Sequence, residues 1–468
     1  MTGQKEDPEG SRFLTELGSL LDPAGLLTGA DVRVRGVGWA SLGSCQAMAI
    51  ARPANTEEVV AILEICRRHV VSVVPLGGGT GLVEGAVAAE HELLLSLERM
   101  RSEPQIDPMT RTAVVDAGVT LEQLQNAADA HNLVFPLDLG ARGSATIGGN
   151  IATNAGGNRV IRFGMMREMV LGLEVVLADG TLLSSLNRML KNNAGYDLKQ
   201  LFIGSEGTLG VITRACLRLR EKWRSQNAAL LSLTSFDNVL KLLKFTDARL
   251  GGSLSAFEAM WGGFYDTVTA PHNGIPAPLD RGQPYYVLIE ALGGDSPGDR
   301  ERFETLLAEI YDSGVLQDAA VAESLIQTMS FWQIRDAVEK LLELGPMIMF
   351  DVSLPISAME EYVAGVRERL AARWPDHRCI VWGHLGDSNL HLWITVHSSD
   401  PGDRAQVEEI VYAPLHEVGG SISAEHGIGL EKRAYLSLTR TDPEISLMRL
   451  LKQTLDPEGI LNPGKVIY

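Results

Sequence analysis

Two histidines on neighbouring strand-like runs have the spacing to share one metal ion. One run, residues 379–384, ends in His384, and the other, residues 390–396, contains His391. If Asp387-Ser388 is a two-residue hairpin turn, His384 stands directly opposite His391, and opposed residues have Cβ atoms about 4.5–5.5 Å apart. A lone histidine is more often a hydrogen-bonded strand residue, and that alternative stays open for either ring. Two opposed imidazoles favour a metal site.

A carboxylate and a further imidazole, Glu425 and His426, stand side by side in a glycine-flanked turn. Two His and one Glu with an open fourth position are the ligand pattern of a catalytic zinc site. The sequence alone does not bring Glu425 to His384, so the residues leave the third ligand open.

Glycine-rich segments indicate a large bound ligand. Residues 77–81 (Gly-Gly-Gly-Thr-Gly) follow a strand-like run, and their backbone N–H groups could converge on a pyrophosphate. An ordinary tight turn is the alternative. Because Glu84 occupies the last glycine position of G-x-G-x-x-G and no Lys-Ser/Thr follows, a Rossmann or P-loop enzyme is disfavoured. Residues 136–157 and 204–210 are also small and nearly uncharged, which favours backbone wrapped around a ligand.

Composition and charge restrict the class of protein. With 468 residues and 45% apolar residues, the chain is expected to form two or three domains of an enzyme. The net charge of −18 disfavours nucleic acid, and an anionic substrate would need local positive charge. The four cysteines have no C-x-x-C spacing and are interpreted as reduced, mostly buried thiols. No apolar segment approaches the roughly 20 residues of a membrane span, and the polar, acidic start predicts neither a signal peptide nor a clear transit peptide.

Periodicity predicts two regions of different organisation. Asn55 and Glu58 form a capping pattern before an amphipathic helix, a strand follows at residues 71–76, and αβ alternation is expected to about residue 220. The later region predicts a largely antiparallel, helix-backed sheet of α+β type. Its expected strands are 228–233, 285–291, 347–354 and a pair within 379–397, with helices at 239–250, 300–311 and 360–373. Residues 455–465 should be irregular.

The three glycine segments, together with residues 195–199 and 462–465, resemble the FAD-binding domain of the vanillyl-alcohol-oxidase (p-cresol methylhydroxylase) superfamily. The resemblance spans nearly the whole chain and is greatest to the D-2-hydroxyglutarate dehydrogenase, D-lactate dehydrogenase and glycolate-oxidase flavoprotein branch. It implies an α+β fold: a two-subdomain FAD-binding module (residues 1–222), a substrate or cap domain with the metal-binding hairpin (223–424), and a segment returning to the flavin site (425–468).

The resemblance also implies that FAD is bound. Members with covalent FAD often use a His in or beside the first glycine loop, and since none stands there, dissociable FAD is expected. The implied FAD-binding residues are Pro75, Gly77, Gly78, Gly79, Thr80, Gly81, Leu82, Pro136, Asp138, Gly143, Ser144, Thr146, Gly149, Asn150, Thr153, Asn154, Gly156, Gly207, Ile212 and Asn462.

For the chemistry, the resemblance implies that His384, His391 and Glu425 bind a divalent metal, with zinc expected, and that His426 is the catalytic base. A D-2-hydroxy acid would lose its hydroxyl proton to His426 and its Cα hydride to flavin N5, giving the 2-oxo acid. Arg335 matches a carboxylate clamp, although by itself it is more typical of a surface helix residue.

The pattern departs from the hydroxyglutarate enzymes at positions expected to contact substrate. Glu339, Met349 and Trp393 stand where those enzymes have a hydroxyl residue, a Lys and an Asn. Each change would weaken binding of a second carboxylate, so a less polar, lactate-like D-2-hydroxy acid is as good an expectation as D-2-hydroxyglutarate. The alternative is an alignment slip of one residue near Met349.

Two other functions remain open at this point. One is a redox-neutral flavin-dependent transferase of the alkylglycerone-phosphate synthase type, and the other is a non-catalytic flavin subunit of an oxidase complex. The expected partners are a small anionic hydroxy acid and an electron acceptor such as an electron-transfer flavoprotein or a quinone, with a homodimer open. The expected location is cytoplasmic, or the mitochondrial matrix in a eukaryote.

Overall fold

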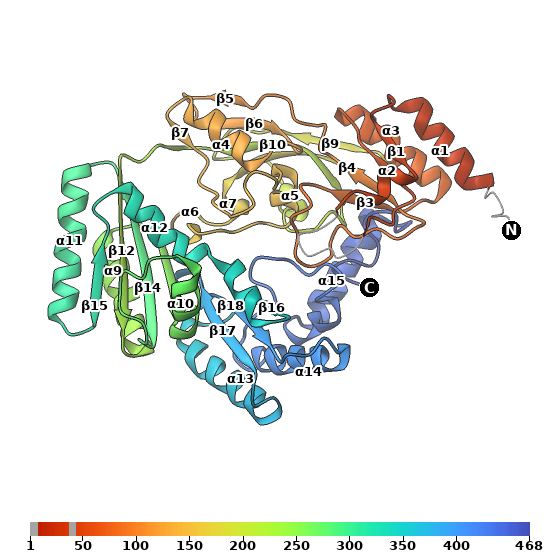
Figure 1. Cartoon of the computed structure of the whole chain (residues 1–468). Coiled ribbons are helices and arrows are strands. Elements are labelled where there is room, and N and C mark those ends of the chain that lie inside the picture. The colour runs from red at the N-terminus through yellow and green to blue at the C-terminus, as the bar shows by residue number, and fades with distance from the viewer. Residues whose placement is uncertain (1–7, 37–43) are drawn as a thin grey trace. The chain divides into compact units, whose positions relative to one another are not determined.

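The computed structural model describes residues 8–36 and 44–468, so the acidic start at residues 1–7 lies outside it (Figure 1). The chain divides into two compact units. Unit 1 comprises the described residues up to Gly156 together with Met165–Lys222 and Glu425–Tyr468, and unit 2 comprises Gly157–Gly164 and Trp223–Ala424.

The first sheet of unit 1 has the strand order β1-β2-β4-β3, with β2, β4 and β3 parallel. Its elements are α1 (Pro8–Leu20), β1 (Leu26–Thr28), α2 (Ala30–Arg33), β2 (Ala49–Ala51), α3 (Thr56–His69), β3 (Val73–Leu76) and β4 (Leu93–Ser96). The Asn55 side chain accepts a hydrogen bond from the Glu58 N–H (2.9 Å), which confirms the predicted helix start. Residues of α1 and α3 share one apolar core with these strands.

The second sheet of unit 1 is antiparallel, with the order β5-β6-β10-β8-β9. The αβ alternation predicted up to residue 220 is wrong in part, because β5–β6 and β8–β9 follow one another without a helix. The elements are β5 (Gln105–Asp107), β6 (Thr112–Asp116), α4 (Leu121–Asp129), β7 (Leu133–Val134), α5 (Ile147–Ala152), α7 (Met166–Met169), β8 (Val170–Val176), β9 (Leu182–Ser185), α8 (Lys199–Phe202), β10 (Val211–Arg218) and β11 (Arg220–Glu221).

The C-terminal segment of unit 1 contains the 3-10 helix η6 (Arg433–Leu438) and α15 (Asp442–Leu455). After α15 no helix or strand follows, which confirms the predicted irregular end. Val73 and Asn462 are nevertheless joined, because the Asn462 N–H donates to the Val73 carbonyl (2.7 Å). The end of the chain therefore lies beside β3, the strand that leads into the first glycine loop.

Unit 2 is built on one antiparallel sheet of seven strands in the order β15-β12-β14-β13-β17-β18-β16, which confirms the predicted α+β architecture. The strands are β12 (Ser225–Leu233), β13 (Leu254–Trp261), β14 (Tyr285–Gly293), β15 (Asp318–Val321), β16 (Ile348–Ser353), β17 (Arg378–Gly383) and β18 (Asn389–Thr395). Sequence periodicity did not predict β13 or β15.

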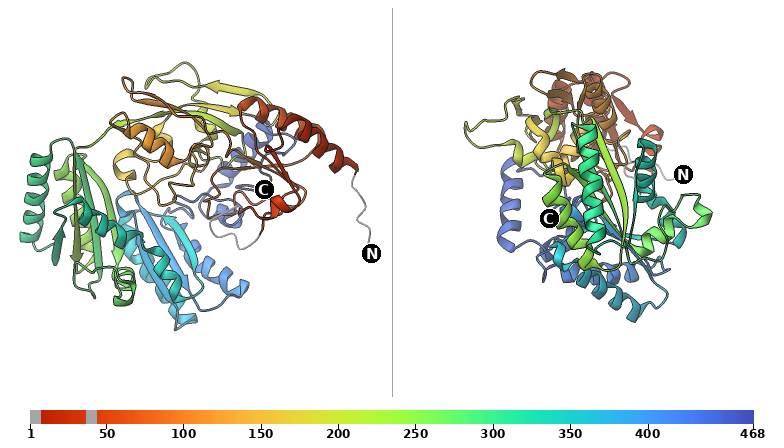
Figure 2. Two further views of the ribbon diagram at one scale, coloured as in Figure 1. Left: turned by 45° about the horizontal axis from the view of Figure 1, so that its top comes forward. Right: turned by 90° about the vertical axis from the view of Figure 1, so that its left-hand side faces the viewer.

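Helices accompany this sheet along its length (Figures 1 and 2). They are α6 (Val160–Phe163), α9 (Phe236–Leu250), α10 (Gly262–Val268), α11 (Ser296–Asp312), α12 (Leu325–Asp336), α13 (Met359–Arg373) and α14 (Pro401–Tyr412), with 3-10 turns η1 (Pro271–Asn273), η2 (Val338–Leu344), η3 (Ile356–Ala358), η4 (Leu385–Asp387) and η5 (Ala413–Leu415). Residues of α10 and α12 bury one apolar core against the sheet. Glu258 and Glu290 point to this same face, since they alternate in step with the core residues Met260 and Leu288.

Two expectations about the whole chain have direct outcomes. Cys45, Cys66 and Cys216 are buried free thiols and Cys379 is partly buried, as predicted. Among the described residues, no helix is both long enough and apolar enough to cross a bilayer.

Candidate active site

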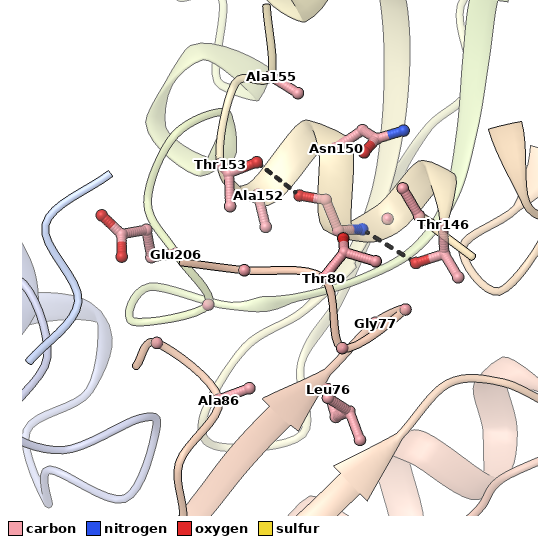
Figure 3. Close-up of a pocket in the computed structure, with 18 of the residues that line it drawn as sticks. Leu76, Gly77, Thr80, Ala86, Thr146, Asn150, Ala152, Thr153, Ala155 and Glu206 are labelled. Atoms are coloured by element: carbon pink, nitrogen blue, oxygen red, sulfur yellow. Dashed lines mark hydrogen bonds between the residues drawn. The ribbon is translucent and has the colours of Figure 1, made fainter. Parts of the chain in front are cut away.

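Unit 1 contains a cavity of about 390 Å³ that is lined mainly by the glycine-rich segments (Figure 3). The first glycine loop, residues 77–81, follows β3 directly and lines this cavity. The second segment contributes Thr146 and α5, and the Thr146 hydroxyl accepts a hydrogen bond from the Gly149 N–H (3.4 Å). At the other end of α5 the Thr153 hydroxyl donates to the Gly149 carbonyl (3.1 Å). Small side chains therefore leave backbone and hydroxyl groups facing an open space.

The first two glycine segments pack so closely that side chains are excluded. A Cβ at Gly77 would lie 2.7 Å from the Thr146 hydroxyl, and a Cβ at Gly78 would overlap the backbone carbonyl of Ser144. Gly79 has a φ of 66°, which favours glycine. An ordinary surface turn would not need this sequence of glycines, so the cradle fits a ligand that requires close backbone approach.

Most of the expected FAD-binding residues line this cavity. They are Pro75, Gly77, Gly78, Gly79, Thr80, Gly81, Leu82, Thr146, Gly149, Asn150, Thr153, Gly156, Gly207 and Ile212. Expected residues that do not line it are Pro136, Asp138, Gly143, Ser144, Asn154 and Asn462. Asn462 acts through its side chain on neighbouring backbone, donating to the carbonyls of Glu206 (2.7 Å) and Gly85 (3.2 Å).

Glu425 and His426 also line the cavity, and a partly buried carboxylate, Glu206, holds the loop that carries them. Glu206 accepts hydrogen bonds from the N–H groups of Ile428 (2.8 Å) and Gly429 (2.9 Å). Burial raises the pKa of Glu206 above its ordinary value, against the effect of these two donors. The sequence analysis placed Glu206 in the third glycine segment but assigned it no role.

In unit 2, His384 and His391 lie together, although the predicted register was wrong by two residues. Trp382, not His384, pairs with His391, because the connection is a longer turn containing η4 and Ser388 with a φ of 72°. A shift of two keeps both imidazoles on the same face of the sheet. Their ring centroids are 5.4 Å apart, and a ligand nitrogen of each lies within 4.8 Å of the other.

Arg335 of α12 contacts His384 and is buried, with 7% of its surface exposed. It is therefore not a surface helix residue. Its Nη2 lies 2.8 Å from His384 Nε2. Both side chains also contact Glu258 of β13, through Arg335 Nε (2.8 Å) and His384 Nδ1 (2.7 Å). Burial alone would raise the pKa of Glu258, but the contacts with His384 and Arg335 hold this pKa below its usual range.

Glu258 was missed because β13 was missed. The available signal was one acidic residue inside the otherwise apolar run of residues 254–261, since a buried charge requires a partner.

The backbone before Glu425 is tied to the histidine hairpin within unit 2. Asp351 of β16 pairs with His391 in register, and its Oδ1 lies 3.9 Å from His391 Nδ1. The Ala424 N–H donates to Asp351 Oδ2 (3.1 Å), and Asn389 Nδ2 donates to Asp351 Oδ1 (2.7 Å). Ala424 is the last residue of unit 2, and Glu425 follows it directly.

Apolar side chains adjoin these polar groups. Met349 pairs with Trp393 across β16 and β18, and Trp393 stands two residues beyond His391 on the same face. Trp393 is 8% exposed, and its ring lies 5.5 Å from that of Trp382. Glu339 is exposed on η2 and adds no charge to this apolar cluster.

Comparisons with known proteins identify the family of this chain. Residues 222–466 match the model of FAD linked oxidases, C-terminal domain, and residues 47–185 match that of an FAD binding domain. The chain is 42% identical over 447 residues to the D-2-hydroxyglutarate dehydrogenase of Xanthomonas citri pv. viticola, covering 93% of both proteins. It belongs to the FAD-linked oxidase family. This membership confirms the resemblance seen in the sequence, the use of FAD and the expected enzyme class, an FAD-linked dehydrogenase.

A plant relative supports the same family, and a solved structure shows the same fold. The mitochondrial D-2-hydroxyglutarate dehydrogenase of Arabidopsis thaliana is 39% identical over 416 residues, covering 89% of this chain and 74% of that protein. The structure of p-cresol methylhydroxylase with substrate bound superposes with a TM-score of 0.78 at 14% identity, covering 98% of this chain and 97% of that one. At that identity the likeness concerns the fold, and it confirms the predicted fold class.

Proposed function

We propose that this family member oxidises a D-2-hydroxy acid to the 2-oxo acid, with Arg335 holding the substrate carboxylate and His426 accepting the hydroxyl proton. The observation that carries the proposal is the buried contact between Arg335 and His384, whose facing nitrogens are 2.8 Å apart. A guanidinium and two imidazoles in one buried cluster supply the hydrogen-bond donors that a carboxylate substrate needs in a chain of net charge −18, with Glu258 offsetting the charge of Arg335.

We further propose that His384, His391 and Glu425 hold a divalent metal, with zinc the expected ion. Two neutral imidazoles and one carboxylate are a donor set that suits zinc with an open position. Support for Glu425 comes from the chain itself: Ala424 is held on Asp351, the register partner of His391, and consecutive Cα atoms are about 3.8 Å apart.

The proposed roles follow from the chemistry of the side chains. Arg335 offers a planar fork of donors that orients a carboxylate, and the His426 imidazole is the proposed acceptor of the hydroxyl proton. When bound, the metal would lower the pKa of the substrate hydroxyl and FAD would accept the hydride. The closely packed glycine cradle holds the FAD in unit 1, and in our proposal Glu206 keeps the Glu425–His426 loop in place.

The substrate side chain is proposed to meet the apolar pair Met349 and Trp393. The relatives are named for D-2-hydroxyglutarate. The second carboxylate of that acid would lose its water against this apolar pair without gaining a hydrogen bond or a cation in return. A less polar D-2-hydroxy acid, lactate-like or bulkier, is therefore the second candidate. The electron acceptor, the homodimer and the cytoplasmic location stay predictions.

An anaerobic experiment tests the reaction. The FAD-loaded, zinc-replete protein is mixed with D- and L-2-hydroxy acids, and flavin bleaching is followed by absorbance. The D-acids should bleach the flavin and the L-acids should not; absence of bleaching by every D-acid would refute the dehydrogenase proposal.

The base is tested separately. His426→Ala should retain FAD but lose substrate-dependent bleaching by about 10²–10⁴-fold. The matched control is His416→Ala, since His416 lies near η5 in unit 2 and has no role in the proposal. Unchanged bleaching in His426→Ala would remove this residue from its proposed role.

A further inference from the structure

One buried carboxylate in unit 2 contacts both an imidazole and the guanidinium of the proposed site. Glu258 is 1% exposed on β13, in the middle of the sheet. Its Oε1 accepts from His384 Nδ1 at 2.7 Å, and its Oε2 accepts from Arg335 Nε at 2.8 Å. The two carboxylate oxygens are thus divided between two residues with different proposed tasks.

The contact with His384 determines which ring nitrogen carries the proton. A carboxylate accepts and cannot donate, so Nδ1 must carry the hydrogen and the lone pair of a neutral ring stands on Nε2. That Nε2 faces Arg335 Nη2, a donor, at 2.8 Å, which is consistent with this tautomer. A metal bound at Nε2 would take the place of this hydrogen bond, because the ring offers one lone pair there. Carboxylates orient metal-binding histidines in this way, through the nitrogen that does not bind the metal.

The contact with Arg335 determines the plane of the guanidinium. Nε is held by Glu258, and Nη2 is directed at His384. Arginine carries five donors in a rigid plane, so fixing two of its nitrogens fixes the directions of all of them. One side chain therefore orients both the proposed carboxylate clamp and one proposed metal ligand.

We propose that Glu258 is a positioning residue that sets the His384 tautomer and the Arg335 orientation together, so that metal affinity and substrate affinity depend on the same carboxylate. This inference rests on the proposed function of His384 and Arg335. It predicts that one substitution in unit 2 changes two binding constants at once.

The same sheet offers a matched control in Glu290 of β14. It is also fully buried and is also paired with an arginine, Arg159, whose Nε lies 2.8 Å from Glu290 Oε1. Its other partners are Ser255, Gln226 and Trp332, and none of them is a proposed ligand or substrate contact. Substituting Glu290 thus disturbs a buried ion pair of the same kind without touching the proposed site.

The test compares Glu258→Gln with Glu290→Gln in the full-length, FAD-loaded protein. After removal of metal by chelator, zinc is titrated back against a competing indicator, and KM and kcat are measured with a D-2-hydroxy acid that bleaches the flavin. In Glu258→Gln a single amide oxygen remains for the two donors, His384 Nδ1 and Arg335 Nε, and the negative charge that strengthens both contacts is lost. Zinc should therefore bind about 10–100-fold more weakly, and KM should rise. In Glu290→Gln the zinc affinity should stay within about twofold of wild type, although the buried arginine is left without its carboxylate.

The outcomes separate the inference from the proposed function. Wild-type zinc affinity in Glu258→Gln, or equal losses in both variants, would overturn the role of Glu258. His384→Ala serves as the reference: if it keeps wild-type zinc affinity, the proposed metal site itself is refuted. If Glu258→Gln does not fold, Glu258→Asp, which keeps the acceptor but shortens its reach, is measured in the same way and should show a smaller loss than His384→Ala.

Discussion

Glu258 and Glu290 are diagonal neighbours across β13 and β14, since Glu258 pairs with Leu288 and Glu290 pairs with Ala256. Diagonal neighbours on one face of a sheet are about 7–8 Å apart, so two buried like charges stand close together. Each therefore needs its own cation: Arg335 of α12 pairs with Glu258, and Arg159 at the start of α6 pairs with Glu290. The two pairs divide one buried face into a part that belongs to the proposed site and a part that does not.

The first prediction concerns stability in acid. Burial alone would raise the pKa of Glu290, but Arg159 and the neighbouring donors hold this pKa below its usual range. In the unfolded chain the glutamate pKa is about 4.3, so in acid the unfolded chain binds more protons than the folded protein. The stabilisation is therefore complete above about pH 4.3 and is lost as the pH falls through the folded-state pKa. The slope contributed is at most about 1.4 kcal/mol per pH unit.

Urea unfolding at a series of pH values between about 3 and 6 checks this window. Glu290→Gln should be less stable than wild type at neutral pH but should lose less further stability as the solution is acidified. An unchanged slope would show that Glu290 does not titrate differently in the folded and unfolded states. Glu258 has a lowered pKa as well, so part of the slope should remain in the variant.

Much of the fold followed from local patterns. The Asn55 cap and the strands at residues 228–233 and 285–291 carry their own signals, because capping and apolar runs are local properties. The strand β13 was not predicted, and Arg335, which pairs with its Glu258, stands 77 residues away in the sequence. The polar core of the site therefore becomes visible only when the sheet brings distant residues together.

In the histidine hairpin, too, the sequence predicted only part of the geometry. The alternation of residues correctly predicted that His384 and His391 share a face. Their register depended on the turn, and Ser388 adopts a left-handed conformation that nothing in the sequence required. Of the residues taken from the resemblance, those in the glycine segments mostly gathered at one cavity, whereas Asn462 serves the neighbouring backbone instead.

The second prediction tests the glycine cradle by two substitutions in one loop. Gly78→Ala should destabilise the protein even without FAD, because the added methyl group overlaps the Ser144 carbonyl. Gly81→Ala should leave the FAD-free protein as stable as wild type, since among the described residues no atom beyond its two chain neighbours lies within 4 Å of its added Cβ. Thermal unfolding of the FAD-free proteins measures this difference, which should be about 1–3 kcal/mol for Gly78→Ala.

Titration of Gly81→Ala with FAD then tests whether the open space at Gly81 is occupied by the cofactor. Because Gly81 lines the cavity, its methyl group should weaken FAD binding although the protein itself is undisturbed. Wild-type FAD affinity in Gly81→Ala would place the cofactor away from this part of the loop.

The third prediction concerns metal retention. His391→Ala should lose zinc affinity by at least about 10–100-fold, the effect usual for disturbing even an indirect partner of a metal, while the visible spectrum of bound FAD is retained. His397→Ala is the control, because His397 lies just beyond the same strand, is exposed and contacts the Asp376 carbonyl (3.1 Å). Metal content after gel filtration in chelator gives the comparison, and equal losses from both variants would contradict a specific role for His391.

The last prediction addresses the substrate through Met349. Met349→Lys places a cation opposite Trp393, where the proposed substrate side chain lies. A charged hydrogen bond to a second carboxylate contributes about 1.5–3 kcal/mol, so kcat/KM for D-2-hydroxyglutarate relative to D-lactate should rise by about 10–100-fold. Met349→Leu keeps the volume and apolar character and should leave the ratio near its wild-type value. A ratio that falls or stays constant in Met349→Lys would show that the second carboxylate does not bind against this pair, because a cation there could only help a dicarboxylate that reaches it.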